Sequence, residues 1–290
     1  AAIRAALQRY STYNWTTETD VATLSFADFG DVSEPDSEAG EARTSQLAAE
    51  ASAHSGLAIG LGGDNSVTFA MARGVFGSKI ETAGLITLDA HHDLRDGISN
   101  GSPVRRLVDE LGLDGRRIVQ IGIADFSNSP AYAARAKELG IHVIPRSALR
   151  DRSMTAVMAE AVEIAGDAGG PIHVDFDVDV CDRSVVPACP AAAPGGISAD
   201  EFRQLAFEAG RYAQVRSVDF TEIDASIDSA DGRTVRLAAL AILELAAGRL
   251  SVSLGSPQSA RQSPAHPAES AGGIGEFCRP AALKTSRSST

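Results

Sequence analysis

The chain has 290 residues, of which 44% are hydrophobic, and a formal net charge of −12. This length allows one large hydrophobic core or two small ones, and the negative charge leaves no basic surface for nucleic acid. No apolar run approaches the roughly 18 residues of a membrane span. The three cysteines are too few for a disulfide framework in a chain this long, which favours a reduced, cytoplasmic setting.

Apolar runs rich in Val, Ile and Leu alternate with helical patterns along the chain. Residues 1–10 follow an ordinary helical pattern, and we expect no secretion signal there. The predicted strands are residues 56–61, 84–89, 117–123, 141–144, 171–178 and 216–223. The predicted helices are residues 103–111, 130–139, 153–165, 199–209 and 233–247. Strands that are apolar on both faces are typical of a parallel sheet, so this alternation predicts an α/β fold with right-handed crossovers.

Helix ends and two segments of unusual composition set the expected boundaries. Ser198 with Glu201 three residues later predicts a capping box, and Gly112 predicts the end of the helix that begins after Ser102. Residues 30–45 are acidic and rich in Gly and Ser, which predicts a surface loop. Residues 1–250 are expected to form a single domain, and residues 251–290, rich in Ser, Pro and Ala, an irregular or disordered tail.

Acid-rich segments follow four of the predicted strands. In open α/β sheets, ligands bind beyond the carboxyl ends of the strands. These segments are residues 62–66, 89–96, 175–182 and 222–224. If the chain is extended there, Asp89, His91 and Asp93 share one side, as do Asp177 and Asp179. The sequence therefore predicts one shared polar site at one edge of the sheet.

The density of carboxylates in these segments needs a compensating charge. Either the pKa values of the carboxyls rise or a metal binds. Mixed carboxylate and imidazole ligands suit Mn, Fe or Zn better than Ca or Mg. Five such ligands are better used by two bridged ions than by one, so we predict a pair of divalent metal ions. A single Asp after a strand is more often a helix cap or turn former, and this interpretation stays open for Asp175.

These motifs resemble those of the ureohydrolase family, which includes arginase, agmatinase, guanidino-acid hydrolases and formimidoylglutamase. The family pattern of GGDHS, DAHxD and SxDxDxxDP stands here as GGDNS (62–66), DAHHD (89–93) and DFDVDVCDR (175–183). PACPAAAPGG (187–196) and TEIDAS (221–226) resemble two further family segments. The resemblance covers about residues 56–247. It implies a three-layer α/β/α sandwich with a central, mostly parallel sheet, and a di-manganese site that hydrolyses a C–N bond.

The resemblance also implies a role for each matching residue. The implied metal ligands are Asp89, Asp93 and Asp177 as bridging ligands, His91 and Asp179 as ligands of one metal, and Asn65 as a weaker ligand in place of the family's histidine. Asp182 matches the acid that hydrogen-bonds the bridging hydroxide and would transfer its proton to the leaving amine. Glu222 matches the carboxylate that faces the substrate cation.

Several stretches are most similar to formimidoylglutamases of the Gram-positive type. They include GGDNS, DAHHDLRDG, NGSPVRRL and IGIADFSNSPAY. This similarity implies hydrolysis of N-formimidoyl-L-glutamate to L-glutamate and formamide, in histidine breakdown. Asn100 stands where arginases and agmatinases have a histidine, and it cannot shuttle a proton. Candidate donors to the anionic substrate are nearby in sequence: Arg95, Arg105, Arg106, Asn100 and Ser102. Of these, Asn100, Ser102 and Arg105 are the predicted substrate-binding residues.

Three alternatives stay open at this point. An agmatinase or guanidino-acid hydrolase would release urea. A non-catalytic binding protein on the same fold would bind metal substoichiometrically, and Asn65 and Asn100 are the best evidence for it. A related zinc deacetylase fold needs one metal, so it would leave the paired aspartates redundant. We otherwise expect a small-molecule amidine substrate and, from the family resemblance, a homo-oligomer.

Overall fold

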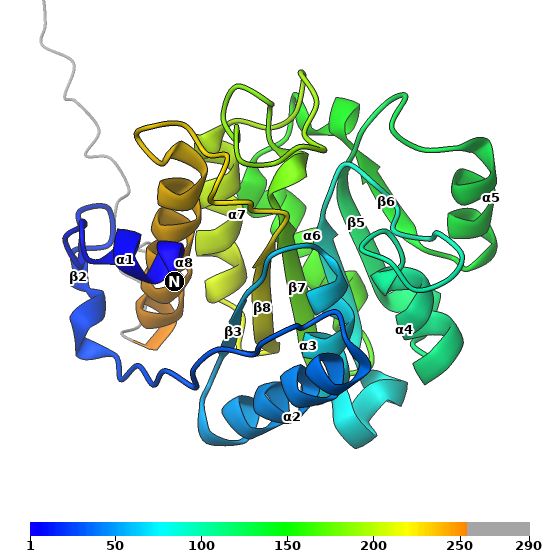
Figure 1. The fold of residues 1–290 in the computed structure, drawn as a ribbon, viewed down its shortest axis with the longest axis horizontal. Coiled ribbons are helices and arrows are strands. Elements are labelled where there is room, and N and C mark those ends of the chain that lie inside the picture. The colour runs from blue at the N-terminus through cyan, green and yellow to red at the C-terminus, as the bar shows by residue number, and fades with distance from the viewer. Residues whose placement is uncertain (254–290) are drawn as a thin grey trace, which may run out of the picture. The chain divides into compact units, whose positions relative to one another are not determined.

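A six-stranded sheet, with all strands parallel, forms the centre of the molecule (Figure 1). The structure is a computed structural model, and it describes residues 1–253. In sheet order the strands are β3 (Ala58–Leu61), β8 (Val215–Thr221), β7 (Ile172–Asp177), β4 (Gly84–Leu88), β5 (Ile118–Ile123) and β6 (His142–Pro145). A short antiparallel pair, β1 (Tyr13–Asn14) and β2 (Thr19–Asp20), precedes the sheet in the chain.

Helices cover both faces of the sheet, which confirms the predicted α/β/α sandwich (Figure 1). One face packs against α6 (Met154–Ala165), α7 (Ala199–Gly210), α8 (Arg233–Ser253) and α1 (Ala2–Leu7). The other face packs against α2 (Glu38–His54), α3 (Ser66–Phe76), α4 (Pro103–Leu111) and α5 (Pro130–Glu138).

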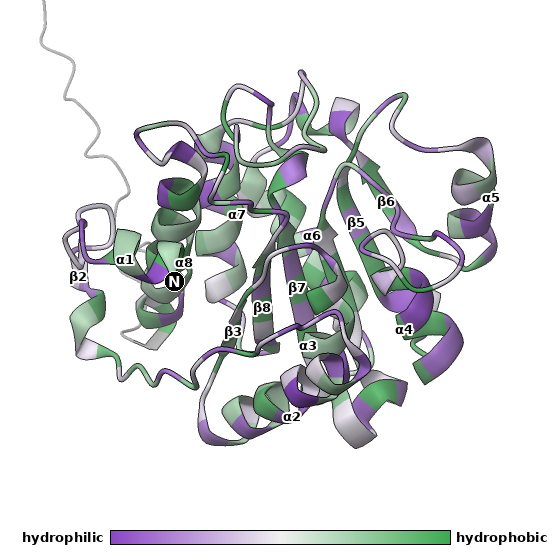
Figure 2. Ribbon diagram, viewed as in Figure 1, coloured by the Kyte–Doolittle hydropathy of each residue, from purple (hydrophilic) through white to green (hydrophobic). Residues whose placement is uncertain are grey.

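The central strands are buried throughout because helices cover them on both sides. Every residue of β4, β5 and β7 is buried, and Figure 2 shows the apolar character of the sheet. Phe176 of β7 stacks on Phe220 of β8 with ring centroids 5.1 Å apart, and it meets Phe202 of α7 edge-on at 5.5 Å. Each aromatic pair contributes about 0.5–1.5 kcal/mol beyond the area that it buries.

The predicted loop at residues 30–45 is wrong in its second half, because α2 begins at Glu38. Ser37 caps this helix by accepting a hydrogen bond from the amide of Gly40. Acidic residues in the first turn of a helix interact favourably with its dipole. Small residues let α2 approach α3 closely, since a Cβ at Gly74 would lie 2.2 Å from the carbonyl oxygen of Ser45. The small residues that made this segment look like a loop thus allow α2 and α3 to pack closely.

The remaining boundaries agree closely with the sequence patterns. The capping box of Ser198 and Glu201 is present, and Gly112 ends α4 in the left-handed region with φ of 78°. Helix α8 runs to Ser253 rather than ending at residue 247. The predicted irregular tail, residues 251–290, therefore begins inside a helix, and the rest of it lies outside the described residues. Within residues 1–253, no helix is long and apolar enough to cross a membrane.

Candidate active site

Three strands that are distant in sequence lie side by side in the sheet and bring the predicted site residues together (Figure 1). Asp89 follows β4, Asp177 ends β7, and Glu222 follows β8. The one-turn 3-10 helix Val178–Val180 carries Asp179 directly after β7. Because the strands are parallel, their carboxyl ends meet at one edge, where α/β sheets bind ligands.

The acid cluster has the donor set and the unmet hydrogen bonding of a metal site. Ligand atoms of Asp89, His91 and Asp179 all lie within 4.8 Å of one another. His91 Nδ1 is 2.7 Å from Asp179 Oδ2 and 3.5 Å from Asp89 Oδ1. Asp89 is fully buried, yet its Oδ2 has no hydrogen-bond partner. Buried charged groups are normally paired or coordinate a metal, so this arrangement fits a divalent cation.

The electrostatics of the cluster lead to the same conclusion. Burial, reinforced by neighbouring carboxylates, raises the pKa of Asp89 and of Asp177 well above its usual range. Burial and the charge of Asp179 raise the pKa of Asp93 to about 7. The hydrogen bond with Asp179 raises the pKa of His91. A bound cation would restore the ionised carboxylates and the neutral imidazole that act as ligands.

The ligand side chains converge through a turn and not through an extended strand. Strand β4 ends at Leu88, and Asp93 lies in the left-handed region with φ of 52°. The predicted alternation of side chains along residues 89–93 is therefore wrong, although the side chains do meet. Glu222 is also left-handed, with φ of 60°. Such residues cost of order 1–3 kcal/mol each and cluster at functional sites.

Backbone amides hold one oxygen of three of the ligand carboxylates. Ala90 N donates to Asp179 Oδ1 at 2.9 Å, and His91 N donates to Asp89 Oδ1 at 2.6 Å. Asp179 N donates to Asp177 Oδ1 at 2.8 Å. Because these bonds fix each carboxylate by one oxygen, the ligand side chains are oriented before any cation binds.

Asn65 acts in this structure as a hydrogen-bond donor to the cluster. Its Nδ2 lies 2.5 Å from Asp93 Oδ2. Its Oδ1 accepts hydrogen bonds from the hydroxyls of Thr68 at 2.7 Å and Thr221 at 3.1 Å. The carboxamide oxygen is thus occupied, which does not support the predicted role of Asn65 as a metal ligand. The side chain positions Asp93 instead.

Glu222 and Asn100 meet beside the cluster, as predicted for residues that face a substrate. Glu222 Oε1 accepts hydrogen bonds from Asn65 N at 3.0 Å and from Asn100 Nδ2 at 3.3 Å. Burial raises the pKa of Glu222. A carboxylate held in this way, next to the acid cluster, can bind a planar cation.

Asp182 is held by its own loop, and its role in proton transfer stays a prediction. Its Oδ1 accepts hydrogen bonds from the amide and the hydroxyl of Ser184, and its Oδ2 from the amide of Gly195. The Gly195 hydrogen bond holds the pKa of Asp182 below its usual range. These hydrogen bonds stabilise the ionised carboxylate and hold its loop in shape.

Ser102 and Arg105 are also held by hydrogen bonds to their own loop. Ser102 is fully buried, and its hydroxyl donates to Ser99 O at 2.8 Å. Arg105 donates to the carbonyls of Arg95 at 2.7 Å and Gly97 at 2.5 Å, and pairs with Asp109 at 3.0 Å. These side chains hold the loop between β4 and α4 in shape, and their role as substrate donors stays a prediction.

Arg95 lies on the same loop, and none of the predicted site residues pairs with its guanidinium. Its side chain is exposed, and its guanidinium has no hydrogen-bond or ion-pair partner among residues 1–253. It packs against the loop, because a Cβ at Gly101 would lie 2.6 Å from Arg95 Cδ. Its positive charge offsets a small part of the rise in the pKa of His91 and of Asp93, which indicates that it lies near the cluster. Its position two residues after Asp93 was the available sequence signal.

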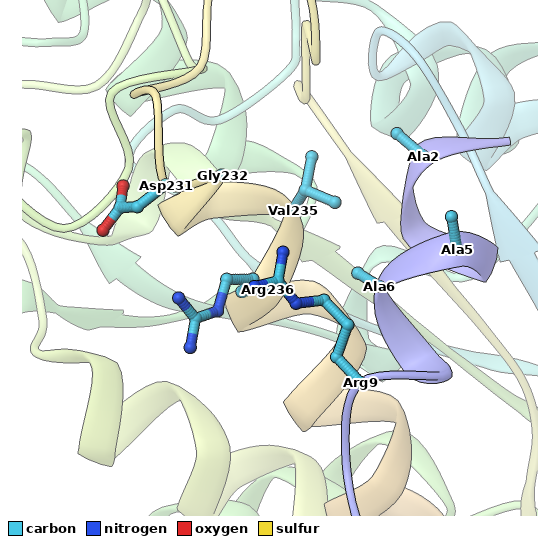
Figure 3. Close-up of a pocket in the computed structure, with 8 residues that line it drawn as sticks. All are labelled: Ala2, Ala5, Ala6, Arg9, Asp231, Gly232, Val235 and Arg236. Atoms are coloured by element: carbon cyan, nitrogen blue, oxygen red, sulfur yellow. The ribbon is translucent and has the colours of Figure 1, made fainter.

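A separate pocket of about 280 Å³ lies between α1 and the first turn of α8 (Figure 3). Alanines of α1 line one side of it, the side chain of Arg9 extends toward α8, and Arg236 of α8 also lines it. Arg236 donates to the hydroxyl of Tyr10 at 2.9 Å. None of the predicted site residues lines this pocket, so we assign the chemistry to the acid cluster.

Comparisons with known proteins agree with this geometry. Residues 1–248 match the sequence model of the arginase family. The formimidoylglutamase of Halalkalibacterium halodurans is 34% identical over 261 residues, which cover 87% of this chain and 81% of that protein. The crystal structure of Bacillus subtilis formimidoylglutamase is 30% identical with a TM-score of 0.80, covering 88% of this chain and 80% of its own. Trypanosoma cruzi formiminoglutamase with Mn²⁺ is 25% identical with a TM-score of 0.78, covering 86% and 84%.

Proposed function

This chain belongs to the arginase family, and from that premise we propose that it is a hydrolase of the C–N bond of a linear amidine. The proposed substrate is N-formimidoyl-L-glutamate, and the products are L-glutamate and formamide. Similarity to formimidoylglutamases supports this choice. The observation that carries the proposal is the convergence of Asp89, His91 and Asp179 within 4.8 Å of one another.

We propose that the cluster holds two divalent metal ions, most simply Mn²⁺, as in the Trypanosoma cruzi relative. The residues that would hold them are Asp89, His91, Asp93, Asp177 and Asp179. Such ions, when bound, supply a hydroxide nucleophile near neutral pH by lowering the pKa of a water. The unpartnered Oδ2 of Asp89 and the mixed carboxylate and imidazole donors support this assignment.

The chain's own residues would orient the substrate and manage its protons. Glu222, held by Asn65 and Asn100, would pair with the amidinium and fix its carbon over the cluster. Asp182 stays the predicted proton carrier, and Asp93 is proposed as a metal ligand. Its Oδ2 is held by Asn65, so its orientation is defined before substrate binds.

The positive charge of Arg95 near the cluster favours an anionic substrate. Arg95 is exposed and unpaired within the described residues, and arginine is well suited to bind a carboxylate through two hydrogen bonds. N-formimidoyl-L-glutamate carries carboxylates at the end away from the amidine. Agmatine carries an amine there and would be repelled by Arg95. This charge therefore argues against the agmatinase alternative.

The test is to load purified protein with Mn²⁺, count the bound metal, and assay products from separate substrates. These are N-formimidoyl-L-glutamate, agmatine, arginine and 4-guanidinobutyrate. We expect close to two metal ions per chain and formamide from the first substrate alone. Urea from a guanidino compound would move the protein to the agmatinase or guanidino-acid hydrolase alternative. Bound metal at one equivalent or less, with no product, would establish the non-catalytic alternative.

The proposal extends to the setting of the enzyme. We propose that it acts in the cytoplasm, in histidine breakdown, as a homo-oligomer and without nucleic-acid partners. The acidic net charge of −12 supports the last point, and family resemblance supports the others. Size-exclusion chromatography with light scattering measures the oligomeric state directly.

A further inference from the structure

The histidine of the acid cluster lies on a turn that the sheet itself does not hold. Strand β4 ends at Leu88. Among residues 1–253, the last backbone hydrogen bond before the turn joins Ala124 N to Ala90 O at 3.0 Å. His91 follows directly, and its amide donates to a carboxylate of the cluster. Because the backbone pairing has ended, other groups must bond to the main chain around His91.

Asn128, on the loop between β5 and α5, bonds to the main chain on both sides of His91. Its Nδ2 donates to Ala90 O and its Oδ1 accepts from His92 N, each at 2.9 Å. A carboxamide suits this position because it offers a donor and an acceptor in one rigid group. His92 is 4% exposed, so without Asn128 its amide would be buried and unpaired. Asn128 therefore fixes the two peptide groups that flank the histidine.

Gln120 of β5 bonds to the same turn from within the sheet. It is fully buried, and its Nε2 donates to His92 O at 3.0 Å. Its Oε1 lies 2.7 Å from His92 Nδ1. A polar side chain buried in a central strand needs hydrogen-bond partners, and both groups of this amide meet that need on one residue of the turn. Gln120 thus anchors the turn immediately after His91.

The imidazole of His91 depends on this main-chain support for its orientation. Nδ1 faces the cluster, 2.7 Å from Asp179 Oδ2, and the side chain is 24% exposed. Nε2 has no hydrogen-bond partner among residues 1–253. A histidine that binds a metal usually donates its other ring N–H to a carboxylate or a carbonyl, which fixes the ring. Since His91 has no such partner in this part of the chain, its backbone sets the direction of the ring.

We propose that Asn128 is a positioning residue that holds His91 in the geometry for binding one of the two metal ions. It acts through the peptide groups at residues 90 and 92 and does not contact the ligand atoms. Asn128 lies in IGIADFSNSPAY (121–132), a stretch in which the sequence pattern assigns no site residue. This inference rests on the metal centre of the proposed function.

Asn128→Ala should weaken the binding of one Mn²⁺ ion and leave the other unchanged. Asp89, His91 and Asp179 form one group of ligand atoms within 4.8 Å of one another, so a displaced imidazole affects the ion bound there. The affinity for that ion should fall by about 10–100-fold, the usual effect of removing a partner that orients a metal ligand. Calorimetric titration of the metal-stripped wild type and variant with Mn²⁺ measures both affinities.

Asn128→Ser is a second, milder variant that keeps a polar group on the loop. Its side chain is too short to span both peptide groups, so it should show the same selective loss of one ion. Ser129→Ala is the matched control. Ser129 caps α5 by accepting a hydrogen bond from Tyr132 N at 3.2 Å and does not bond to the turn. Its removal should lower the melting temperature of the metal-free protein by about 2–4 °C and leave both Mn²⁺ affinities unchanged.

Each outcome decides the question. Unchanged Mn²⁺ affinities in both Asn128 variants overturn the inference and leave the metal centre standing. Equal weakening of both ions, or an equal loss in Ser129→Ala, assigns Asn128 to the general stability of its loop and also overturns it. Failure of both Asn128 variants to fold, while Ser129→Ala folds, has the same meaning. Absence of Mn²⁺ binding by the wild type would overturn the proposed function and the inference together.

Discussion

Two buried clusters of charge in this protein differ in how well they are balanced. In the first, Arg106 of α4 lies over the Phe69 ring at 3.7 Å and pairs with Glu41 at 2.6 Å and Glu110 at 2.9 Å. In the second, at the carboxyl ends of β4 and β7, buried carboxylates face one another, and Asp89 Oδ2 has no partner.

The balanced cluster ties three helices together, whereas the acidic one gathers several buried carboxylates around one histidine, His91. Arg106 together with Arg73, which pairs with Glu41 at 3.0 Å, balances the two glutamates, so this cluster contributes to packing and needs nothing from solution. In the acidic cluster the pKa values of the carboxyls rise instead. Burial of charge is therefore not by itself a functional signal. Several buried groups of the same charge, some with unpartnered atoms, are a functional signal.

Removing a carboxylate from the acidic cluster should have the largest effect on function. In Asp177→Asn we expect formamide release to fall to background and the metal content to drop, because an amide is a poor bridging ligand. Metal analysis and a formamide assay measure both. Asp182→Asn is the matched control and should retain its metal, since Asp182 binds only its own loop. Full activity and full metal content in Asp177→Asn would contradict the assignment of Asp177 as a metal ligand.

Lowering the pH should stabilise the metal-free protein against unfolding. A cluster with balanced charges would not have this effect. The pKa of Asp93 is raised to about 7, from about 3.9 in an unfolded chain. The folded state therefore binds the extra proton, and this stabilisation is complete below about pH 4 and lost as the pH rises through about 7. The effect is of order a few kcal/mol.

Melting curves at pH 5, 6, 7 and 8, with and without Mn²⁺, test this. As the pH rises, the melting temperature of the metal-free protein should fall. The stabilisation by Mn²⁺ should grow over the same range, because metal binding releases protons. A metal-free melting temperature that rises over this range would contradict the acidic cluster's electrostatics.

Breaking the balanced cluster should cost stability and spare metal binding. Arg106→Met leaves Glu41 and Glu110 without their shared partner and should lower the free energy of unfolding by roughly 2–3 kcal/mol, near the low end for buried pairs because the glutamates are partly exposed. Urea unfolding gives this value. Calorimetric titration should show unchanged Mn²⁺ affinity; a weakened site would mean that the two clusters are coupled.

Arg95 tests whether a positive charge near the acid cluster binds the carboxylates of the substrate. Arg95→Met should raise KM for N-formimidoyl-L-glutamate by about 10–100-fold, the loss of a charged hydrogen bond, with metal content unchanged. Steady-state kinetics and metal analysis separate the two effects. Arg95→Lys keeps the charge and should recover part of the loss. An unchanged KM would remove Arg95 from substrate binding.

The residue pattern alone was sufficient for an α/β fold with a parallel sheet and for a polar site at one edge of that sheet. Two-sided apolar runs predict a parallel sheet, and acids after those runs must gather at its carboxyl edge whatever the strand order. This is why Asp89, Asp177 and Glu222 were predicted together. Helix α2 escaped prediction because its small and acidic residues are equally typical of a loop.

Side-chain partners depended on contacts that no local pattern encodes. Asp182 follows Asp179 by three residues, yet the loop through Gly195 takes both of its oxygens. Asn65 donates to Asp93, and Asp175 shares Thr221 with Asn65, because β8 lies beside β7 in the sheet. Spacing along the chain selects which strand end a side chain reaches. The order of the strands and the turns after them, which are set by packing of the whole core, select which atom it meets.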